Sequence, residues 1–366
     1  MADVRIDKLR LTQYRNYTSL DMRPGPGINA ILGDNAQGKT NAAEAIFLCA
    51  FGRSHRTAKD SELIMHGCAG GYVGVDLTNN TGSHLIELKL RDGERKKIYI
   101  DRQQASKTGE LMGHLNVVMF APEDLAIVKE GPSERRRFMD MEISQTHPAY
   151  FYRLQRYNAA LKQRNALLKE QIQPNAEMLD VWDQQLAALG EDIMIDRYDF
   201  IDGLSTIAYD LHRSISGGRE SLEIAYEPSL KAEGDFYGEM MDALKRSVQE
   251  DLRRGFTTVG PHRDDIAISL SGVDLRAFGS QGQKRTAALS LKLSELTFLR
   301  ELKDEPPVLI LDDVLSELDD SRQRLLLESM QQCQCFLTCT SLEGVKRAGL
   351  NDIKVFRCVS GSMEEE

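Results

Sequence analysis

The chain has 366 residues, of which 41% are hydrophobic and 28% charged, the balance of a globular protein with room for two or three lobes. Its formal net charge of −10 weighs against a non-specific coat on nucleic acid. No apolar run approaches the roughly 18 residues that span a bilayer, and residues 1–7 lack the layout of a signal peptide, so we expect a cytoplasmic protein without a membrane partner.

The first part of the chain, residues 4–101, is rich in predicted strands. Apolar and polar residues alternate at 4–11, 74–77 and 85–90, and turns that contain Gly or Asn separate these runs. A period of two is typical of strands that bury one face. The segment 28–32 reads as a further short strand, and it ends directly before the most specific motif of the chain.

That motif is a phosphate-binding loop of the form G-x-x-x-x-G-K-[ST]. Its residues are Gly33, Asp34, Asn35, Ala36, Gln37, Gly38, Lys39 and Thr40. The glycines let the backbone wrap a polyphosphate, so that successive N–H groups point at its oxygens. We expect Lys39 to reach the β- and γ-phosphates and the Thr40 hydroxyl to ligate Mg²⁺. The apolar segment 41–50 reads as the helix whose N-terminus adds partial positive charge, so the motif predicts ATP and Mg²⁺ as cofactors.

A helical pattern follows in the middle of the chain. Mostly apolar residues recur at steps of three or four along two stretches, which are separated by a break at Pro174-Asn175. The first stretch contains Leu154, Tyr157, Leu161, Asn165, Leu168 and Ile172. The second contains Leu179, Trp182, Leu186, Leu189, Ile193, Arg197, Phe200, Leu204, Ile207 and Leu211. This stepping is typical of helices that pack along one stripe. We therefore predict two helices that fold back on each other as an antiparallel arm.

The segment 278–286 predicts a second anion site. Ser280 suits the N-cap of a helix that runs to Arg300, and Gln283 completes a capping box. A turn of small residues at a helix N-terminus can bind an anion, although a plain helix cap explains the same residues. Because the chain already holds a complete phosphate loop, the second site favours a head-to-tail dimer in which each copy covers the other's ATP.

An apolar strand at 308–311 ends in Asp312 and Asp313. Ligands of open α/β sheets bind at the C-terminal ends of the strands, although a solvated acidic turn is the simpler alternative. We predict that Asp312 joins Thr40 around Mg²⁺ and that Asp313 orients or deprotonates the attacking water. Lys39, Asp312 and Asp313 are thus the predicted catalytic residues.

The segment 335–338 reads as a second buried parallel strand in this part of the chain. Cys333, Cys335 and Cys339 cluster there, but their spacing does not match a zinc site. We expect these residues to be reduced and buried thiols.

Together, the loop at 33–40, the helical insertion, S-Q-G-Q at 280–283, the acidic strand end and S-E-L-D at 316–319 resemble the ABC-type ATPases of the SMC and Rad50 class. Further strings resemble the RecF family of bacterial DNA repair proteins: residues 14–17, 33–41, 52–53, 122–125, 131–132, 136–138 and 260–265. The fold class is therefore predicted as α/β, an ABC-type ATPase lobe interrupted by an antiparallel coiled-coil-like arm. The predicted parts are residues 1–121 with the phosphate loop, 122–255 as the arm, and 256–366 with the signature motif and the acidic strand end.

The resemblance implies an ATP-dependent homodimer that clamps double-stranded DNA at single-strand gaps. It implies a RecR-like partner and support of RecA-type filaments in repair, replication and SOS induction. By the family pattern, Ser280 and Gly282, with Gln283 beside them, contact the other copy's ATP, while Arg15 and Asn16 line the pocket around Lys39. Binding of ATP would drive dimerisation and hydrolysis would release it.

The chain departs from related ATPases at a few positions. Asp313 stands where ABC transporters carry the longer Glu, so we expect weak, DNA-dependent hydrolysis. Glu123 stands where relatives have Gln, and Thr340 or Ser341 where transporters have His. A transporter ATPase subunit and a non-hydrolysing ATP-dependent scaffold are the alternative functions, and the arm argues against the first.

Basic clusters are the remaining candidates for contact with DNA. They lie at 135–137, 95–97, 253–254 and at Arg53, Arg56 and Lys59. Solvated surface or ion pairing is the simpler explanation of any one of them, so we assign no residue to DNA.

Overall fold

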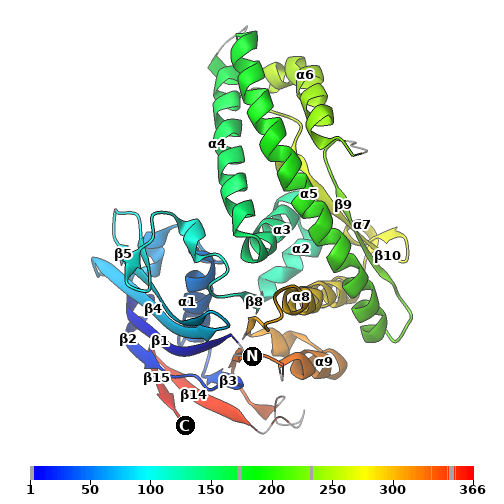
Figure 1. The fold of residues 1–366 in the computed structure, drawn as a ribbon. Helices are drawn as coiled ribbons and strands as arrows, with labels where there is room; N and C mark the ends of the chain where they lie inside the picture. Colours follow the sequence, from blue (N-terminus) through cyan, green and yellow to red (C-terminus); the bar gives the residue numbers. More distant parts are fainter. Residues whose placement is uncertain are drawn as a thin grey trace. The chain divides into compact units, whose positions relative to one another are not determined.

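The computed structural model describes residues 4–170, 175–230, 234–330, 332–343, 345, 350 and 352–366. The chain forms two units, drawn in Figure 1. The first unit comprises Met1–Asp124 and Leu289–Glu366, and the second comprises Leu125–Ala288. The second unit thus begins close to the predicted boundary at residue 121, whereas it ends well beyond the predicted boundary at residue 255.

One sheet of the first unit is antiparallel and comes entirely from the N-terminal part. Its strands lie in the order β2-β1-β4-β5-β6-β7. Their bounds are β1 Arg5–Tyr14, β2 Tyr17–Met22, β4 Gly70–Asn79, β5 Gly82–Arg91, β6 Lys97–Ile100 and β7 Gln103–Gln104. The predicted runs at 4–11, 74–77 and 85–90 fall in β1, β4 and β5, which confirms that the period of two marks strands here.

The other sheet of the first unit joins both ends of the chain. Its order is β15-β14-β3-β13-β12-β8, parallel except for β15, which pairs antiparallel with β14. The bounds are β3 Ile28–Leu32, β8 Val117–Phe120, β12 Val308–Asp312, β13 Cys335–Cys339, β14 Ile353–Val359 and β15 Ser362–Glu365. Every residue of β12 and β13 is buried, so both predicted C-terminal strands are confirmed.

Helix α1 of the first unit packs on this sheet. Helix α1, Lys39–Phe51, is buried over nearly its whole length, and α9 spans Asp320–Met330. Short helical turns complete the unit: η1 Asp60–Leu63, η2 Thr108–Leu111, η3 Pro122–Asp124 and η5 Val314–Glu317. Cys333, Cys335 and Cys339 are buried free thiols, as predicted. Within the described ranges no group of three or more metal-ligating side chains gathers.

The second unit is mainly helical and contains the predicted arm. Its helices are α2 Leu125–Lys129, α3 Pro132–Thr146, α4 Pro148–Glu170, α5 Ala176–Ile215, α6 Phe236–Arg254 and α7 Leu275–Phe278. Helices α4 and α5 pack against each other side by side, and α6 packs on both (Figure 1). The antiparallel pair is confirmed, and α6 adds a third helix that the stepping pattern did not predict. Ile172 and Pro174, at the predicted break, lie outside the described residues.

A small sheet explains why the second unit extends past residue 255. Its order is β11-β10-β9, with β9 Leu222–Glu227, β10 Asp265–Leu270 and β11 Val273–Asp274. Strand β10 pairs antiparallel with β9, which follows α5 directly in the chain. The turn η4, Pro261–Arg263, and the start of α8, Gln281–Lys303, therefore belong to the same unit as the arm.

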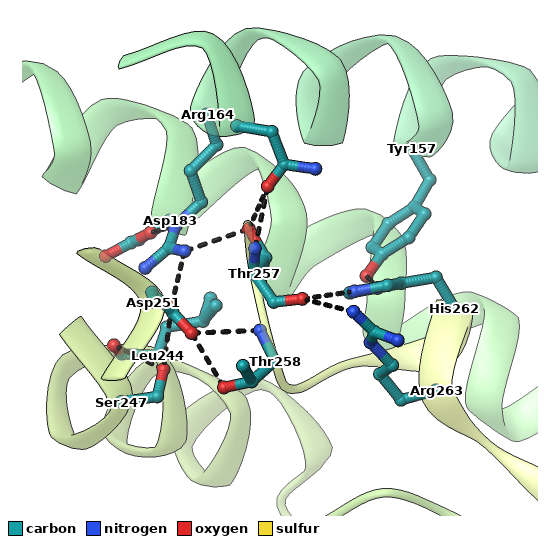
Figure 2. Close-up of polar contacts among 11 residues, drawn as sticks. Tyr157, Arg164, Asp183, Leu244, Ser247, Asp251, Thr257, Thr258, His262 and Arg263 are labelled. Atoms are coloured by element: carbon teal, nitrogen blue, oxygen red, sulfur yellow. Dashed lines mark hydrogen bonds and ion pairs between the residues drawn. The ribbon is translucent and has the colours of Figure 1, made fainter. Parts of the chain in front are cut away.

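The arm buries charged groups as well as the predicted apolar stripe. The stripe residues Tyr157, Leu168, Leu179, Leu186, Ile193, Arg197, Phe200 and Leu204 are buried. Between them lies Arg164, fully buried, whose Nε donates to Asp183 at 2.6 Å and whose Nη1 donates to Asp251 at 2.6 Å (Figure 2). One guanidinium of α4 thus pairs with a carboxylate on each of α5 and α6, and buried charges need such partners.

The turn after α6 is tied into the same cluster. Thr257 accepts a hydrogen bond from Arg164 Nη1 at 2.9 Å, and its carbonyl oxygen lies 3.0 Å from His262 Nε2 (Figure 2). The other ring nitrogen of His262 lies 2.8 Å from the Tyr157 hydroxyl of α4. Burial lowers the pKa of His262 to about 4, so the ring is neutral at pH 7 and serves as a structural hydrogen-bonding group.

No helix within the described ranges combines the length and the apolar character that a bilayer crossing requires.

Candidate nucleotide-binding site

The phosphate loop connects the end of β3 to the first residue of α1, as the sequence predicts. Gly38 adopts φ 119°, a conformation that favours glycine, and caps the helix. A Cβ atom on Gly38 would lie 2.6 Å from Asn16 Nδ2, so this position has no room for a side chain. Asp34, Asn35 and Ala36 are exposed, which leaves the other side of the loop open to a ligand.

Lys39 is buried, and its ammonium folds back over the loop. Its Nζ donates to the carbonyl oxygens of Gly33 and Asp34, each at 2.9 Å. The cation is therefore held above the stretch whose N–H groups would face a phosphate, which is the position that phosphate recognition needs.

The structure brings Thr40 and Asp312 together from opposite ends of the chain. The Thr40 hydroxyl donates to Asp312 Oδ1 at 2.9 Å. Burial raises the pKa of Asp312, and the nearby carboxylates of Asp313 and Glu123 raise it further against the hydrogen bonds that the group accepts. Hydroxyl and carboxylate oxygens are the hard donors that Mg²⁺ prefers, and a cation would relieve this crowding of negative charge. The donor set fits Mg²⁺.

Thr338 is a site residue that the sequence analysis missed. It stands opposite Asp312 in the parallel pairing of β12 with β13. Its hydroxyl donates to Asp312 Oδ1 at 2.6 Å and accepts from the Asp313 N–H at 3.0 Å. The sequence could have indicated this residue. When the predicted parallel strands 308–311 and 335–338 are aligned at their C-terminal ends, Thr338 falls beside the acidic pair.

Asp313 follows directly at the end of β12 and adopts φ 53°. A left-handed conformation is costly for a residue with a side chain, and such strain gathers at functional sites. Asp313 precedes η5, which contains Ser316 and Glu317, and the side chains of these two residues lie outside the described part of the chain.

Arg15 and Asn16 lie behind the loop and beside α1. Arg15 forms a two-point ion pair with the buried Glu44, at 2.9 and 2.7 Å, and donates to the Glu62 carbonyl at 2.8 Å. This pairing holds the pKa of Glu44 below its usual value in spite of burial. Asn16 Nδ2 donates to the Gln37 carbonyl at 2.7 Å. Both side chains thus contact the loop or its helix.

The signature segment opens α8 in the second unit. Ser280 and Gln283 form the predicted capping box: Gln283 Oε1 accepts from the Ser280 N–H at 2.8 Å, and Ser280 Oγ accepts from the Gln283 N–H at 3.3 Å. Ser280 and Gly282 are exposed. Gln283 Nε2 also donates to Glu220 at 2.8 Å, which fixes the cap against the end of the arm.

The basic clusters are largely ion-paired. Arg135 is nearly fully buried and pairs with Asp265 at 2.6 Å, while Arg136 donates to the Asp264 carbonyl at 2.6 Å. Other described pairs join Lys96 to Asp60, Lys59 to Glu62, Arg137 to Glu134, Arg253 and Arg254 to Glu250, and Arg56 to Glu44. Internal pairing therefore explains Arg135, as the simpler reading of that cluster predicted.

The chain matches known proteins over nearly its whole length. The family model described as RecF/RecN/SMC N terminal domain matches residues 5–361. The DNA replication and repair protein RecF of Alkaliphilus oremlandii is 43% identical over 364 residues, which cover 98% of this chain and 100% of the relative. The RecF protein of Acetivibrio thermocellus is 44% identical, covering 97% of this chain and 98% of the relative.

Solved structures give the same relationship. The recombination mediator protein RecF with ATP, described as part of the RecFOR pathway, matches with a TM-score of 0.92 and 36% identity, covering 100% of this chain and 98% of that chain. An Smc head domain from Pyrococcus furiosus, bound to the C-terminal domain of ScpA, matches with a TM-score of 0.59 and 17% identity, covering 99% of this chain and 96% of that chain. The second match concerns the fold alone.

Proposed function

This chain belongs to the RecF/RecN/SMC family and, within it, to the RecF DNA replication and repair proteins, and on that basis we propose that it is an ATP-dependent DNA clamp of recombinational repair. The observation that carries the proposal is the assembled loop with Lys39 above it and Thr40 beside Asp312. The clamp binds duplex DNA at single-strand gaps in the cytoplasm, acts with a RecR-like partner and helps load a RecA-type recombinase.

The loop amides of residues 33–40 hold the ATP phosphates, and Lys39 pairs with the β- and γ-phosphates. Thr40 and Asp312 hold Mg²⁺, which, when bound, neutralises charge on the phosphate oxygens. Asp313 orients the attacking water and accepts its proton. Arg15 and Asn16 support the pocket from behind, because both contact the loop or α1. Hydrolysis is slow, since the Asp313 carboxylate is one methylene shorter than a glutamate.

Dimerisation completes the site. Ser280, Gly282 and Gln283 of one copy contact the γ-phosphate held by the other copy's Lys39. The exposed capping box at the start of α8 supports this role, because the dipole of that helix favours a negative ligand at its N-terminus. ATP therefore closes the dimer around DNA, and hydrolysis opens it.

The decisive experiment measures oligomeric state and DNA binding together, by sedimentation velocity with and without ATP and Mg²⁺ on duplex, single-stranded and gapped DNA. Ser280→Arg should keep ATP binding by the monomer but lose the dimer, because a bulky cation replaces the capping hydroxyl. Lys39→Ala should lose ATP binding itself. Ser214→Arg, on the exposed surface of α5, is the matched control and should dimerise normally.

Normal dimerisation of Ser280→Arg with ATP would overturn the composite site. Unchanged ATP affinity in Lys39→Ala would overturn the assignment of the phosphate loop. A second candidate, an ATP-dependent scaffold without hydrolysis, is favoured by the short Asp313 carboxylate. It predicts that the dimer forms with ATP but that no phosphate is released, even with gapped DNA present.

A further inference from the structure

The phosphate loop is held from behind by the turn between the last two strands. The Gln37 carbonyl oxygen accepts from the Gly361 N–H at 3.0 Å and from Asn16 Nδ2 at 2.7 Å, and the Cys358 thiol lies 3.4 Å from it. The Gln37 side chain is held too, because its Oε1 accepts from the Ser360 N–H at 2.6 Å. Gln37 is thereby fixed through both its backbone and its side chain.

Fixing this carbonyl fixes the direction of an amide that faces the ligand. In a trans peptide the C=O and the following N–H point in opposite directions, and no described peptide bond is cis. Because the donors hold the Gln37 carbonyl toward the rear, the Gly38 N–H points to the open side of the loop. The Tyr17 hydroxyl donates to the Gly38 carbonyl at 3.0 Å and orients the Lys39 N–H in the same way.

The hairpin β14–β15 lies so close to Asn16 and to Gly33 that no side chain fits at two of its contacts. A Cβ atom on Gly361, which adopts φ 76°, would lie 2.1 Å from the Asn16 carbonyl oxygen. A Cβ atom on Gly33 would lie 2.3 Å from the Cys358 carbonyl oxygen. Backbone therefore meets backbone at the start of the loop, between Gly33 and Cys358, and between Gly361 and Asn16, whose side chain holds the Gln37 carbonyl.

The amide of Asn16 is itself oriented by a relay from the surface. Its Oδ1 accepts from Asn41 Nδ2 at 2.9 Å, and Asn41 Oδ1 accepts from Arg56 Nη1 at 2.9 Å. With its oxygen engaged in this way, the Asn16 nitrogen faces the Gln37 carbonyl. The turn at residues 360–361 and the Arg56 relay thus hold the same atom from two sides.

We propose that Gln37 is a positioning residue through which the turn after β14, residues 360–361, holds the phosphate loop in its ATP-binding conformation. The inference rests on the proposed function, since it assumes that this loop binds ATP. It adds that the C-terminal hairpin β14–β15 sets the affinity for ATP. The hydrogen bonds of the hairpin described above go to Gln37, whereas Asp312 is bonded to Thr40 and Thr338, so we expect affinity and chemistry to separate.

Gly361→Ala tests the proposal, because the added methyl group pushes the turn away from Asn16. We expect the Kd for ATP and the KM of hydrolysis to rise about tenfold, as for the loss of one buried hydrogen bond, while kcat stays within about twofold. Gly93→Ala is the matched control: it stands in the turn after β5 at φ 73°, with nothing within 4 Å of its Cβ position.

Both variants impose left-handed strain and should lose thermal stability, Gly361→Ala more because its Cβ atom also meets the Asn16 carbonyl oxygen, but only Gly361→Ala should lose ATP affinity. Gln37→Met is the second test, since it keeps the side-chain length and removes the acceptor for the Ser360 N–H. It should also raise the Kd for ATP. Titration calorimetry with ATP and Mg²⁺ measures all four proteins, wild type included.

Wild-type affinity in both Gly361→Ala and Gln37→Met would overturn the positioning role, and so would an equal loss of affinity in Gly361→Ala and Gly93→Ala. If Gly361→Ala does not fold, Gln37→Met decides alone. Failure of the wild-type protein to bind ATP at all would overturn the proposed function instead, so the two failures are distinguishable.

Discussion

A single threonine hydroxyl holds the two acidic residues of the site. Thr338 donates to the Asp312 carboxylate and accepts from the Asp313 N–H, at 2.6 and 3.0 Å. The first bond leaves the carboxylate aimed at Thr40, and the second fixes the backbone of Asp313 in its left-handed conformation. The hydroxyl therefore positions both the group that we propose to bind Mg²⁺, Asp312, and the group that we propose to orient water, Asp313.

Thr338→Val removes this hydroxyl with little change in shape. We expect kcat for ATP hydrolysis to fall about ten- to a hundredfold, because a hydrogen bond to a charged group is lost and a buried N–H is left without its acceptor. The Kd for ATP should change little, since the loop and Lys39 are untouched. Phosphate release and titration calorimetry measure the two quantities.

The matched control for Thr338→Val is Thr206→Val, at an exposed position of α5, which should leave kcat unchanged. A wild-type kcat in Thr338→Val would show that the strand end holds Asp312 and Asp313 in place by itself.

At the scale of elements, the arm is held together by charge as well as by apolar packing. Arg164 on α4 is fully buried and contacts Asp183 on α5 and Asp251 on α6. Burial raises the pKa of Asp183, and the adjacent Arg164 guanidinium opposes this rise because it favours the ionised carboxylate. The cluster determines how the three helices pair, since another alignment would leave a buried charge unpaired.

Arg164→Met should therefore lower the free energy of unfolding of the second unit by about 3–5 kcal/mol, because it leaves uncompensated buried carboxylates. Arg153→Met, on the same helix, is the control. Arg153 pairs with Asp192 and Asp196 but its side chain is 34% exposed, so its loss should cost about 1 kcal/mol or less. Urea denaturation followed by circular dichroism measures both, and equal losses would contradict the role of the buried cluster.

At the scale of the whole molecule, the nucleotide site needs both ends of the chain and, in the proposed function, a second copy. Strands β3 and β14 pair directly although about 325 residues separate them along the chain, and the arm is an insertion between the two halves of the first unit. Within the described residues, the loop and the acidic strand end lie in the first unit, while the signature motif lies in the second. Formation of the closed dimer therefore depends on the loop, the acidic strand end and the signature motif together.

Asp313→Asn should trap that dimer. The variant keeps the Thr40–Asp312 pair that we propose holds Mg²⁺, but its amide cannot accept a proton from water, so ATP should stay bound. We expect the ATP-dependent dimer to persist in sedimentation runs over a period in which the wild-type dimer dissociates as ATP is consumed. Asp202→Asn, on the exposed face of α5, should behave like wild type. Equal lifetimes for Asp313→Asn and wild type would exclude hydrolysis as the step that opens the dimer.

The local features of this protein follow from its sequence alone. The loop at 33–40, the strands at 28–32 and 308–311, the capping box at Ser280 and the paired helices all follow from spacing and periodicity within short segments. These patterns are reliable because backbone geometry relates them directly to the structure. Helix α6 was not predicted, although it carries an apolar stripe that includes the buried residues Met240 and Leu244.

Only the tertiary structure decided which distant residues support the site. Thr338 meets Asp312 through strand pairing, Ser360 meets Gln37 across 323 residues, and Arg164 meets Asp251 across 87. No local periodicity records such contacts, because they depend on how strands and helices pack after they have formed. The sequence alone therefore determined that this protein carries a phosphate loop and an arm. The packing of the two chain ends against each other decided what holds that loop in position, because buried hydrogen bonds form only between groups that the fold brings together.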